Sequence, residues 1–424
     1  MHDYRVLRDD VEMLRGAIER RGKRDQYEPV IARGIALDAS RRAMIQAVEE
    51  KKAARNQNSQ EVARRKRNKE DAEELIAAGR LLGEEIAGLE YELGQSQAHL
   101  DAILLDLPNV TLDEVPAGDE SANRIEKSWG TPRDSAGCKP HWELAAQLGI
   151  LDLERGAKIS GSGFVVMRGA GARLTRALMN LFIDLHTREH GYEEVWVPVL
   201  VNRRTMIGTG QLPKFEEDMY AIRDEEMYLV PTAEVPVTNL YRDEILTGAE
   251  LPRGFVAYTP CFRREAGAAG KDTRGLLRLH QFDKVEIVRY TTPEQSAEEH
   301  ERLTRHAETL LERLGLPYRR VLLAAGDTGQ SSAKTWDLEA WAPGVGKFLE
   351  VSSCSTFTDY QARRANIRYR PAAGEKPRFV HTLNGSGLAF PRVIACLLEH
   401  YQQPDGTVRL PEVLHPYMGT AVLG

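Results

Sequence analysis

A loop dense in arginine lies between two predicted strands, and its residue types suit the binding of phosphate. The first strand, residues 255–263, is rich in β-branched and aromatic residues, and the second, residues 281–289, alternates apolar with polar ones. Guanidinium forks match phosphate oxygens, and glycine lets the backbone approach a ligand closely. The sequence therefore predicts a triphosphate site, although a solvated loop explains the charges equally well. The loop combines glycines with these charged residues: Arg263, Arg264, Glu265, Lys271, Arg274 and Arg278.

The second strand divides its side chains between two faces. Successive residues of a strand point to opposite sides, so Phe282, Lys284 and Glu286 share one face. Val285 and Ile287 then point to the other face. A carboxylate at position 286 is either a ligand-binding group or an ordinary surface residue of the strand.

Length and composition limit the classes of protein to consider. The chain has 424 residues, enough for two or three domains, and a net charge of -6, so nucleic acid would have to bind at local basic patches. The four cysteines are scattered without a CxxC pair, which disfavours a disulfide framework and a zinc site and suits a reducing cytosol. We expect a cytoplasmic protein, because the charged N-terminus lacks a signal-peptide pattern and no apolar run is long enough to span a membrane.

The N-terminal quarter predicts helices that form a coiled coil. Apolar spacing indicates a short helix over residues 4–21, and Pro29 is suited to open a longer one. A second long helix ends before Pro108, with Gly79 and Ser96 as weak positions in its seam. Two long helices joined by a polar segment predict an antiparallel hairpin. The seam of the second helix follows a heptad pattern: Leu75, Leu82, Ile86, Leu89, Leu93, Leu100, Ile103 and Leu107.

A basic segment lies at the far end of this predicted hairpin. Residues 51–69 contain eight cations and a single anion, Glu61. Such a run is often a solvated helix face, but on an acidic protein it favours contact with a phosphate backbone. The cations are Lys51, Lys52, Arg55, Arg64, Arg65, Lys66, Arg67 and Lys69.

The remaining chain predicts an α+β domain. Residues 108–140 are typical of a linker, and an amphipathic helix over 173–190 precedes a strand over 193–200 that contains Pro198. Proline inside a strand indicates a sheet edge or a subunit boundary. A further helix over 292–314 and a strand, turn and helix over 381–401 complete a pattern without βαβ rhythm.

The segment FRREAGAAGKDTRGLLRLHQFDKVE resembles the second signature motif of class II aminoacyl-tRNA synthetases, specifically of bacterial seryl-tRNA synthetases. The resemblance covers nearly the whole chain. It implies a core antiparallel sheet flanked by helices, and a coiled-coil arm that grips tRNA. It also implies a homodimer through the helix and strand over 173–200. The expected domains are a tRNA-binding domain over 1–107, a linker and start of the core over 108–140, and a catalytic domain over 141–424.

The resemblance also implies roles for individual residues. Arg263, Glu286 and Arg392 are the expected catalytic residues, with Arg392 on the third motif. This chain departs from the family at Pro391, where glycine is common. Glu350 and Ser353 are the expected ligands of Mg²⁺. The serine site would comprise Thr232, Ala233, Glu234, Glu286 and Ser386, and the ATP site Arg263, Arg264, Glu265, Glu350, Val351, Ser352, Ser353 and Arg392.

The implied activity is ligation of serine to tRNA-Ser, with ATP as co-substrate and tRNA-Sec left open as a further acceptor. Two other classes stay open: a ligase with the same core that charges a carrier protein, and a paralogue that binds tRNA without catalysis. The basic arm disfavours the first, and the catalytic residues above disfavour the second. A purely structural coiled-coil protein would leave residues 112–424 without a role.

Overall fold

The computed structural model describes residues 1–266 and 274–424, so Lys271 of the arginine-rich loop lies outside the described residues. The chain forms two compact units. The first comprises Met1–Glu19 and Lys23–Pro108, and the second Arg20–Gly22 and Asn109–Gly424. Within the described ranges, no helix is both long and apolar enough to cross a membrane.

The N-terminal unit is helical throughout, and its first part differs from the prediction. The helix expected over 4–21 is two helices, α1 (Val6–Asp9) and α2 (Val11–Arg20), because Asp10 leaves helical geometry with φ -153°. The long helix α3 (Arg24–Arg67) begins before Pro29, so Pro29 lies inside it and does not open it. Pro29 and Asp25 are exposed. Water can therefore solvate the Asp25 carbonyl that proline leaves without its usual N–H donor.

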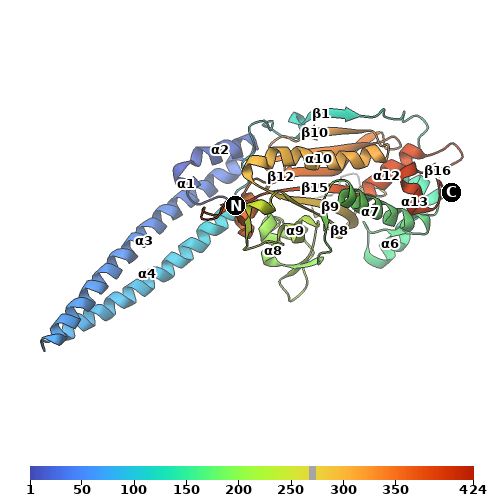
Figure 1. Cartoon of the computed structure of the whole chain (residues 1–424). Coiled ribbons are helices and arrows are strands. Elements are labelled where there is room, and N and C mark those ends of the chain that lie inside the picture. Colours follow the sequence, from blue (N-terminus) through green and yellow to red (C-terminus); the bar gives the residue numbers. More distant parts are fainter. Residues whose placement is uncertain (267–273) are drawn as a thin grey trace. The chain divides into compact units, whose positions relative to one another are not determined.

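The helices α3 and α4 (Glu73–Asp106) lie side by side as an antiparallel pair (Figure 1). Leu100 and Ile103 of the predicted seam are buried on α4. The weak seam position Gly79 marks a close approach: the Asn58 amide donates to the Leu75 carbonyl at 2.7 Å. A Cβ atom at Gly79 would lie 2.9 Å from that amide nitrogen, so glycine makes room for the bond.

The second unit is built on an eight-stranded sheet with the order β1-β10-β11-β12-β15-β9-β8-β4. All neighbours are antiparallel except β4 and β8. The segment expected as a linker contributes the outer strand β1. The bounds are β1 (Arg124–Trp129), β4 (Glu193–Glu194), β8 (Arg253–Phe262), β9 (Gln281–Thr291), β10 (Tyr318–Leu322), β11 (Lys334–Ala342), β12 (Lys347–Thr356) and β15 (His381–Ala389).

Helices cover both faces of this sheet. The helices α7 (Ala170–Arg188), α10 (Ser296–Arg313) and α12 (Phe390–Tyr401) lie along the sheet (Figure 1). The largest core joins them to one face of the sheet, and Val285 and Ile287 are fully buried in that core. On the other face, Val288 and Tyr290 pack with α9 (Glu234–Thr238) and α11 (Tyr360–Ala365). The predicted alternation along residues 281–289 is therefore confirmed.

The strand expected over 193–200 is interrupted. Strand β4 ends at Glu194, β5 (Leu200–Asn202) pairs elsewhere, and Pro198 lies between them. Proline has no N–H to donate to a neighbouring strand, so it ends the pairing. Strand β4 is the last strand in the sheet order, as an edge position requires.

The remaining elements are short. The helices are α5 (His141–Gln147), α6 (Leu153–Ser160), α8 (Arg203–Thr209) and α13 (His415–Met418). The strands form small sheets or pairs: β2 (Leu151–Asp152), β3 (Val166–Met167), β6 (Met227–Leu229), β7 (Ile245–Thr247), β13 (Arg368–Arg370), β14 (Arg378–Phe379), β16 (Val408–Arg409) and β17 (Val422–Leu423).

Candidate active site

Two adjoining cavities lie over the face of the sheet that carries Lys284 and Glu286. The larger has a volume of about 620 Å³ and the smaller about 190 Å³. Six residues line both, so the two cavities form one composite site. The shared residues are Arg263, Glu265, Arg278, Lys284, Glu350 and Ser386.

The carboxylate of Glu286 is the centre of the larger cavity's polar contacts. Glu286 is 1% exposed, and its Oε2 lies 2.5 Å from the Lys284 ammonium. The Thr232 hydroxyl donates to Oε2 at 3.1 Å, and the Asn384 amide donates to Oε1 at 3.2 Å. Ser386 is the cross-strand partner of Glu286 in the pairing of β15 with β9. The arrangement offers a buried anion with adjacent hydroxyls, which suits a small ligand that carries an ammonium and a hydroxyl group.

A second buried carboxylate, Glu234, lies at the start of α9 and lines the same cavity. The Gln361 amide donates to it at 2.6 Å, and the Thr382 hydroxyl in turn donates to Gln361 at 2.7 Å. Burial, followed by the neighbouring Glu286 charge, raises the pKa of Glu234 to about 7. The adjacent Ala233 is fully buried in the core, so only its backbone is available to a ligand.

The segments on either side of residues 267–273 bring cations to both cavities. Arg263 follows β8, and its guanidinium lies over the Phe282 ring at 5.2 Å from the ring centre. Arg278 forms an ion pair with Glu265, whose backbone adopts φ +50°. Arg264 is exposed, and its backbone N–H donates to the Asp218 carbonyl at 2.9 Å. The structure thus brings Arg263, Glu265 and Arg278 together, and leaves Arg264 outside the set that lines the cavities.

Arg392 lines the smaller cavity from the first turn of α12. Its Nη1 donates to the Glu350 carbonyl at 2.8 Å, and its Nε donates to the Leu277 carbonyl at 3.2 Å. Pro391 is in the first turn of α12, where a backbone N–H has no partner within the helix, so proline is accommodated. Before it, β15 shifts register, and Leu388 adopts φ +106° within the bulge.

A register shift also shapes the segment 350–353 of β12. The shift lies opposite Leu338 and Glu339, and Val351 points into the main core. Ser352 is buried and its hydroxyl donates to the Ser386 carbonyl at 2.6 Å, while Glu350 and Ser353 line the larger cavity. Of the four predicted residues, Glu350 and Ser353 therefore have side chains that are available to a ligand in that cavity.

Asp337 pairs with Ser353 in the ladder between β11 and β12. Burial and the Glu350 charge hold the pKa of Asp337 well above its ordinary value. Its Oδ1 is buried without a hydrogen-bond partner in the described part of the chain. Asp337 also lines a further cavity of about 430 Å³ that shares Glu350 and Ser353 with the larger one.

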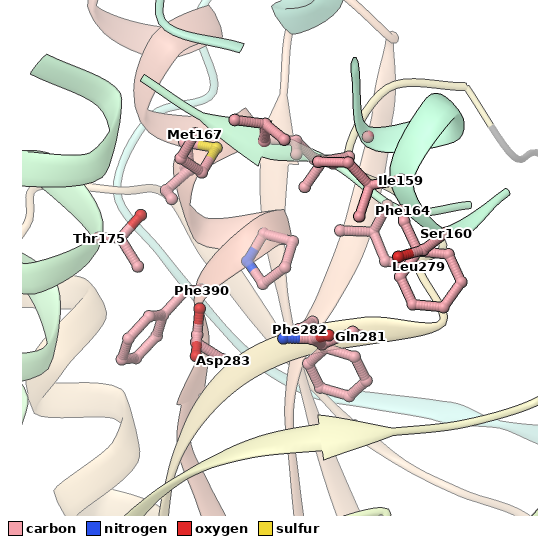
Figure 2. A pocket seen from close by; sticks show the side chains of 16 residues that line it. Ile159, Ser160, Phe164, Met167, Thr175, Leu279, Gln281, Phe282, Asp283 and Phe390 are labelled. Carbon is pink, nitrogen blue, oxygen red and sulfur yellow. The ribbon is translucent and has the colours of Figure 1, made fainter. Parts of the chain in front are cut away.

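A separate cavity of about 250 Å³ adjoins the smaller one through Leu276, Leu279, Phe282 and Pro391. Figure 2 shows Met167, Thr175 and Phe390 around the same space. The Phe282 ring and Pro391 therefore form a wall with open space on two sides.

Sequence reasoning missed several residues that the structure brings to the composite site. Lys284 is two positions earlier on the same strand face, so its contact followed from strand periodicity. Asn384 is two positions before Ser386 on β15, within a segment already singled out. Asp337 and Gln361 come from distant parts of the chain and carry no local signal in the sequence.

The basic segment of the N-terminal unit is partly neutralised. Lys51 pairs with Glu85 and Lys52 with Glu90, each at 2.6 Å, across the two long helices. Arg64 and Arg65 pair with Glu61 at 2.7 and 3.1 Å. Among the described residues, four of the eight predicted cations form no ion pair: Arg55, Lys66, Arg67 and Lys69.

Two family models match the chain. The Seryl-tRNA synthetase N-terminal domain matches residues 1–111, and the tRNA synthetase class II core domain (G, H, P, S and T) matches residues 214–401. A serine–tRNA ligase of Gemmatimonas aurantiaca is 64% identical over 424 residues, which is 100% of both chains. One of Geobacillus kaustophilus is 53% identical over 425 residues and 99% of both.

Solved structures agree with these matches. The structure of seryl-tRNA synthetase from Pyrococcus horikoshii complexed with ATP aligns with a TM-score of 0.94 at 38% identity, covering 100% of this chain and 99% of that one. A cytoplasmic serine–tRNA ligase from Naegleria fowleri in complex with AMP aligns with a TM-score of 0.89 at 30% identity, covering 100% and 98%.

Proposed function

The chain belongs to the seryl-tRNA synthetases, a family of class II aminoacyl-tRNA synthetases, and we propose that it ligates serine to tRNA-Ser with ATP. The observation that carries this function is the buried Glu286 carboxylate, with Lys284, Thr232 and Asn384 around it, beside a cavity lined by arginines. A small amino acid and a nucleotide can thus be held next to each other.

We propose that serine occupies the part of the larger cavity around Glu286. The Glu286 carboxylate would bind the serine ammonium. Thr232, whose hydroxyl bonds that carboxylate, and Ser386, which lines the same cavity, would contact the serine side chain. Glu234 would help to close the pocket, and Ala233 would contribute backbone only. A site built to hydrogen-bond a hydroxyl rejects the analogue without it by about 10⁴-fold or more.

The proposed ATP site is the smaller cavity together with the shared residues. Arg263 would bind the α-phosphate, where charge develops in the transition state, and Glu265 would accept from the adenine amino group. Phe282 and Arg392 flank the space for the base, with Arg392 reaching towards the outer phosphates. Arg264 would add positive charge from the exposed rim. Val351 and Ser352 would contribute through their backbone, because their side chains are engaged elsewhere.

The donor set at Glu350 and Ser353 fits Mg²⁺ bound together with ATP. One carboxylate and one hydroxyl are few protein ligands, as Mg²⁺ prefers when phosphate and water supply the rest. The unpaired Oδ1 of Asp337, next to Ser353, is a buried acceptor that a cation would satisfy directly or through water. Bound there, Mg²⁺ would neutralise negative charge on the phosphates.

The chemistry follows from these positions. The carboxylate of serine attacks the α-phosphorus of ATP, a new P–O bond forms, and pyrophosphate leaves. Arg263 stabilises the charge on the α-phosphate, while Glu286 keeps the serine carboxylate directed at it. The terminal ribose hydroxyl of tRNA then attacks the acyl carbon of seryl-adenylate and AMP leaves. No covalent enzyme intermediate is required.

We propose that the basic segment 51–69 of the arm binds the tRNA backbone. Its four cations without ion pairs are the available phosphate contacts, whereas Lys51 and Lys52 would first have to leave Glu85 and Glu90. Recognition through backbone and shape would leave tRNA-Sec as a second acceptor to be tested with its transcript.

We propose a homodimer from two exposed apolar side chains, and a cytoplasmic location from the family to which the chain belongs. Trp196 is 79% exposed and Ile159 74% exposed, and burying such side chains against a partner would remove apolar surface from water. Trp196 lies beside Pro198 and the edge strand β4, where the family resemblance implies a subunit interface. Sedimentation equilibrium of the wild type and of Trp196→Glu tests the dimer.

The test of the function is charging of purified tRNA-Ser with labelled serine, ATP and Mg²⁺. Serine bound to tRNA establishes both steps and the acceptor. Serine-dependent pyrophosphate exchange without charging indicates a different acceptor, such as a carrier protein. The absence of both reactions in a folded protein contradicts the assignment.

A further inference from the structure

Two consecutive residues at the start of α5 hold the returning end of the arginine-rich loop. The backbone N–H of Leu276 donates to His141 Nε2 at 3.0 Å. The Arg274 guanidinium lies over the Trp142 ring, 5.9 Å from its centre. His141 is fully buried. It precedes Leu276 by more than a hundred residues in the sequence. Residues 274–276 are thus held by a part of the protein that lines neither of the two proposed substrate cavities.

The hydrogen bonds determine which nitrogen of His141 carries the proton. Because Leu276 donates to Nε2, that nitrogen must accept, and Nδ1 must be the protonated one. Nδ1 then donates to Oε1 of Glu399 at 2.7 Å. Glu399 also accepts from the backbone N–H groups of His141, Gly344 and Val345 at 2.8, 2.8 and 3.0 Å. The imidazole is therefore held in one orientation by a carboxylate that is itself fully engaged.

The backbone of Gly275 packs directly against His141. A Cβ atom at Gly275 would lie 2.4 Å from His141 Nε2, and Gly275 adopts φ +61°. Both facts require glycine at this position. The contact between Gly275 and His141 is therefore a defined backbone contact that a larger residue at position 275 would disrupt.

A second side chain fixes the next residue of the loop. The Leu277 carbonyl accepts from Arg392 Nε at 3.2 Å. Arg392 and Glu399 both lie on α12, so this helix controls both hydrogen bonds, one directly and one through His141. Leu276 and Leu277 are themselves wall residues of the smaller cavity, beside Arg278.

We propose that His141 is a positioning residue for ATP: it fixes the Leu276 peptide and, with it, the wall of the nucleotide cavity and the approach of Arg278. This role rests on the proposed function. It concerns binding of the nucleotide and leaves the serine pocket around Glu286 unchanged. His141 lines neither of the proposed substrate cavities.

Two variants of His141 separate the loop contact from the contact with Glu399. In His141→Asn the amide reaches the Nδ1 position and still donates to Glu399, but Leu276 loses its acceptor. In His141→Gln an oxygen reaches the Nε2 position and can accept from Leu276. In serine-dependent pyrophosphate exchange we expect H141N to raise KM for ATP about tenfold, the factor for one lost buried hydrogen bond. KM for serine should stay within twofold, and H141Q should recover most of the loss for ATP.

Hydrogen exchange of the Leu276 amide gives a readout that is independent of catalysis. It should be protected in the wild type and in H141Q, and exchange at least tenfold faster in H141N. Gly275→Ala displaces the same loop without touching Glu399, and should give the same rise in KM for ATP. His415→Asn is the control. The His415 ring bonds the Leu410 carbonyl at 3.0 Å and lines neither substrate cavity, so this change should alter neither KM.

Equal rises in KM for ATP and KM for serine would overturn the proposal. So would an unchanged KM for ATP together with unchanged hydrogen exchange of the Leu276 amide in H141N and G275A. If the wild type itself does not catalyse serine-dependent pyrophosphate exchange, the proposed function fails. The Leu276 amide then still reports whether His141 fixes the loop.

Discussion

Replacing Glu286 with glutamine tests the centre of the proposed serine site. Glu286→Gln keeps the shape and one acceptor oxygen but removes the charge that faces Lys284, Thr232 and Asn384. A hydrogen bond to a charged group contributes about 1.5–3 kcal/mol. At 1.4 kcal/mol per factor of ten, loss of the contact with the serine ammonium should raise KM for serine by roughly 10- to 150-fold. KM for ATP should not rise, because Lys284, no longer paired with a carboxylate, stays available to a phosphate.

The same substitution also perturbs folding, and this effect has to be separated. Lys284 is 5% exposed and would lose the charge of its partner. Removal of one member of a buried ion pair costs about 3–5 kcal/mol, with glutamine near the lower limit because it retains a hydrogen bond. The control is Glu299→Gln, because Glu299 is 2% exposed and pairs with Arg289 on the opposite face of the sheet.

The assay is serine-dependent pyrophosphate exchange, with thermal unfolding of each variant in parallel. Both variants should lose stability, but only E286Q should raise KM for serine. An unchanged KM for serine in E286Q, or the same rise in E299Q, would refute the reasoning that Glu286 binds the amino acid.

Three further predictions concern other parts of the chain. The raised pKa of Glu234 disfavours its ionised form in the folded state, so the penalty is absent below pH 4.5 and complete above about pH 7. Glu234→Gln should remove this penalty. The change in unfolding free energy from pH 4 to pH 8, measured by urea unfolding, should therefore be about 3 kcal/mol more favourable in the variant than in the wild type. Pro391→Gly should lower the unfolding free energy by roughly 0.5–1 kcal/mol, because proline suits the first turn of α12 and restricts the unfolded chain, and should leave KM for ATP within twofold in kinetics. Substituting glutamine for Arg55, Lys66, Arg67 and Lys69 should weaken tRNA binding and reduce its salt dependence more than substituting glutamine for Lys51 and Lys52. Filter binding measures both effects, and equal effects of the two sets would contradict the prediction.

Features with a short period in the sequence were predictable. The alternation along β9 correctly separates Glu286 from Val285 and Ile287, because the period of a strand is fixed by its geometry. The heptad seam of α4 was predictable for the same reason, and the buried Leu100 agrees with it. In both cases every residue needed for the inference lies within a few turns or strand positions.

Features that depend on distant contacts were not predictable. The acceptor for Leu276 is His141, and the partner of Glu234 is Gln361, in each case more than a hundred positions away. Pro29 shows another limit, since a proline is tolerated inside a helix when the carbonyl it leaves open faces water. A count of charges likewise cannot show that Lys51 is already paired with Glu85.

Three cations of the site are paired with carboxylates of the protein itself. Arg278 pairs with Glu265, Lys284 with Glu286, and Arg392 Nη1 lies 3.3 Å from the carboxylate of Glu350. Each cation is therefore oriented and partly desolvated, so little reorganisation is needed when phosphate replaces the carboxylate as its partner. The Lys284 ammonium lines both cavities and lies against the carboxylate proposed to bind the serine ammonium. It follows that serine, by supplying a positive charge to Glu286, would release Lys284 towards a phosphate, and that the two substrates should bind more tightly together than either binds alone.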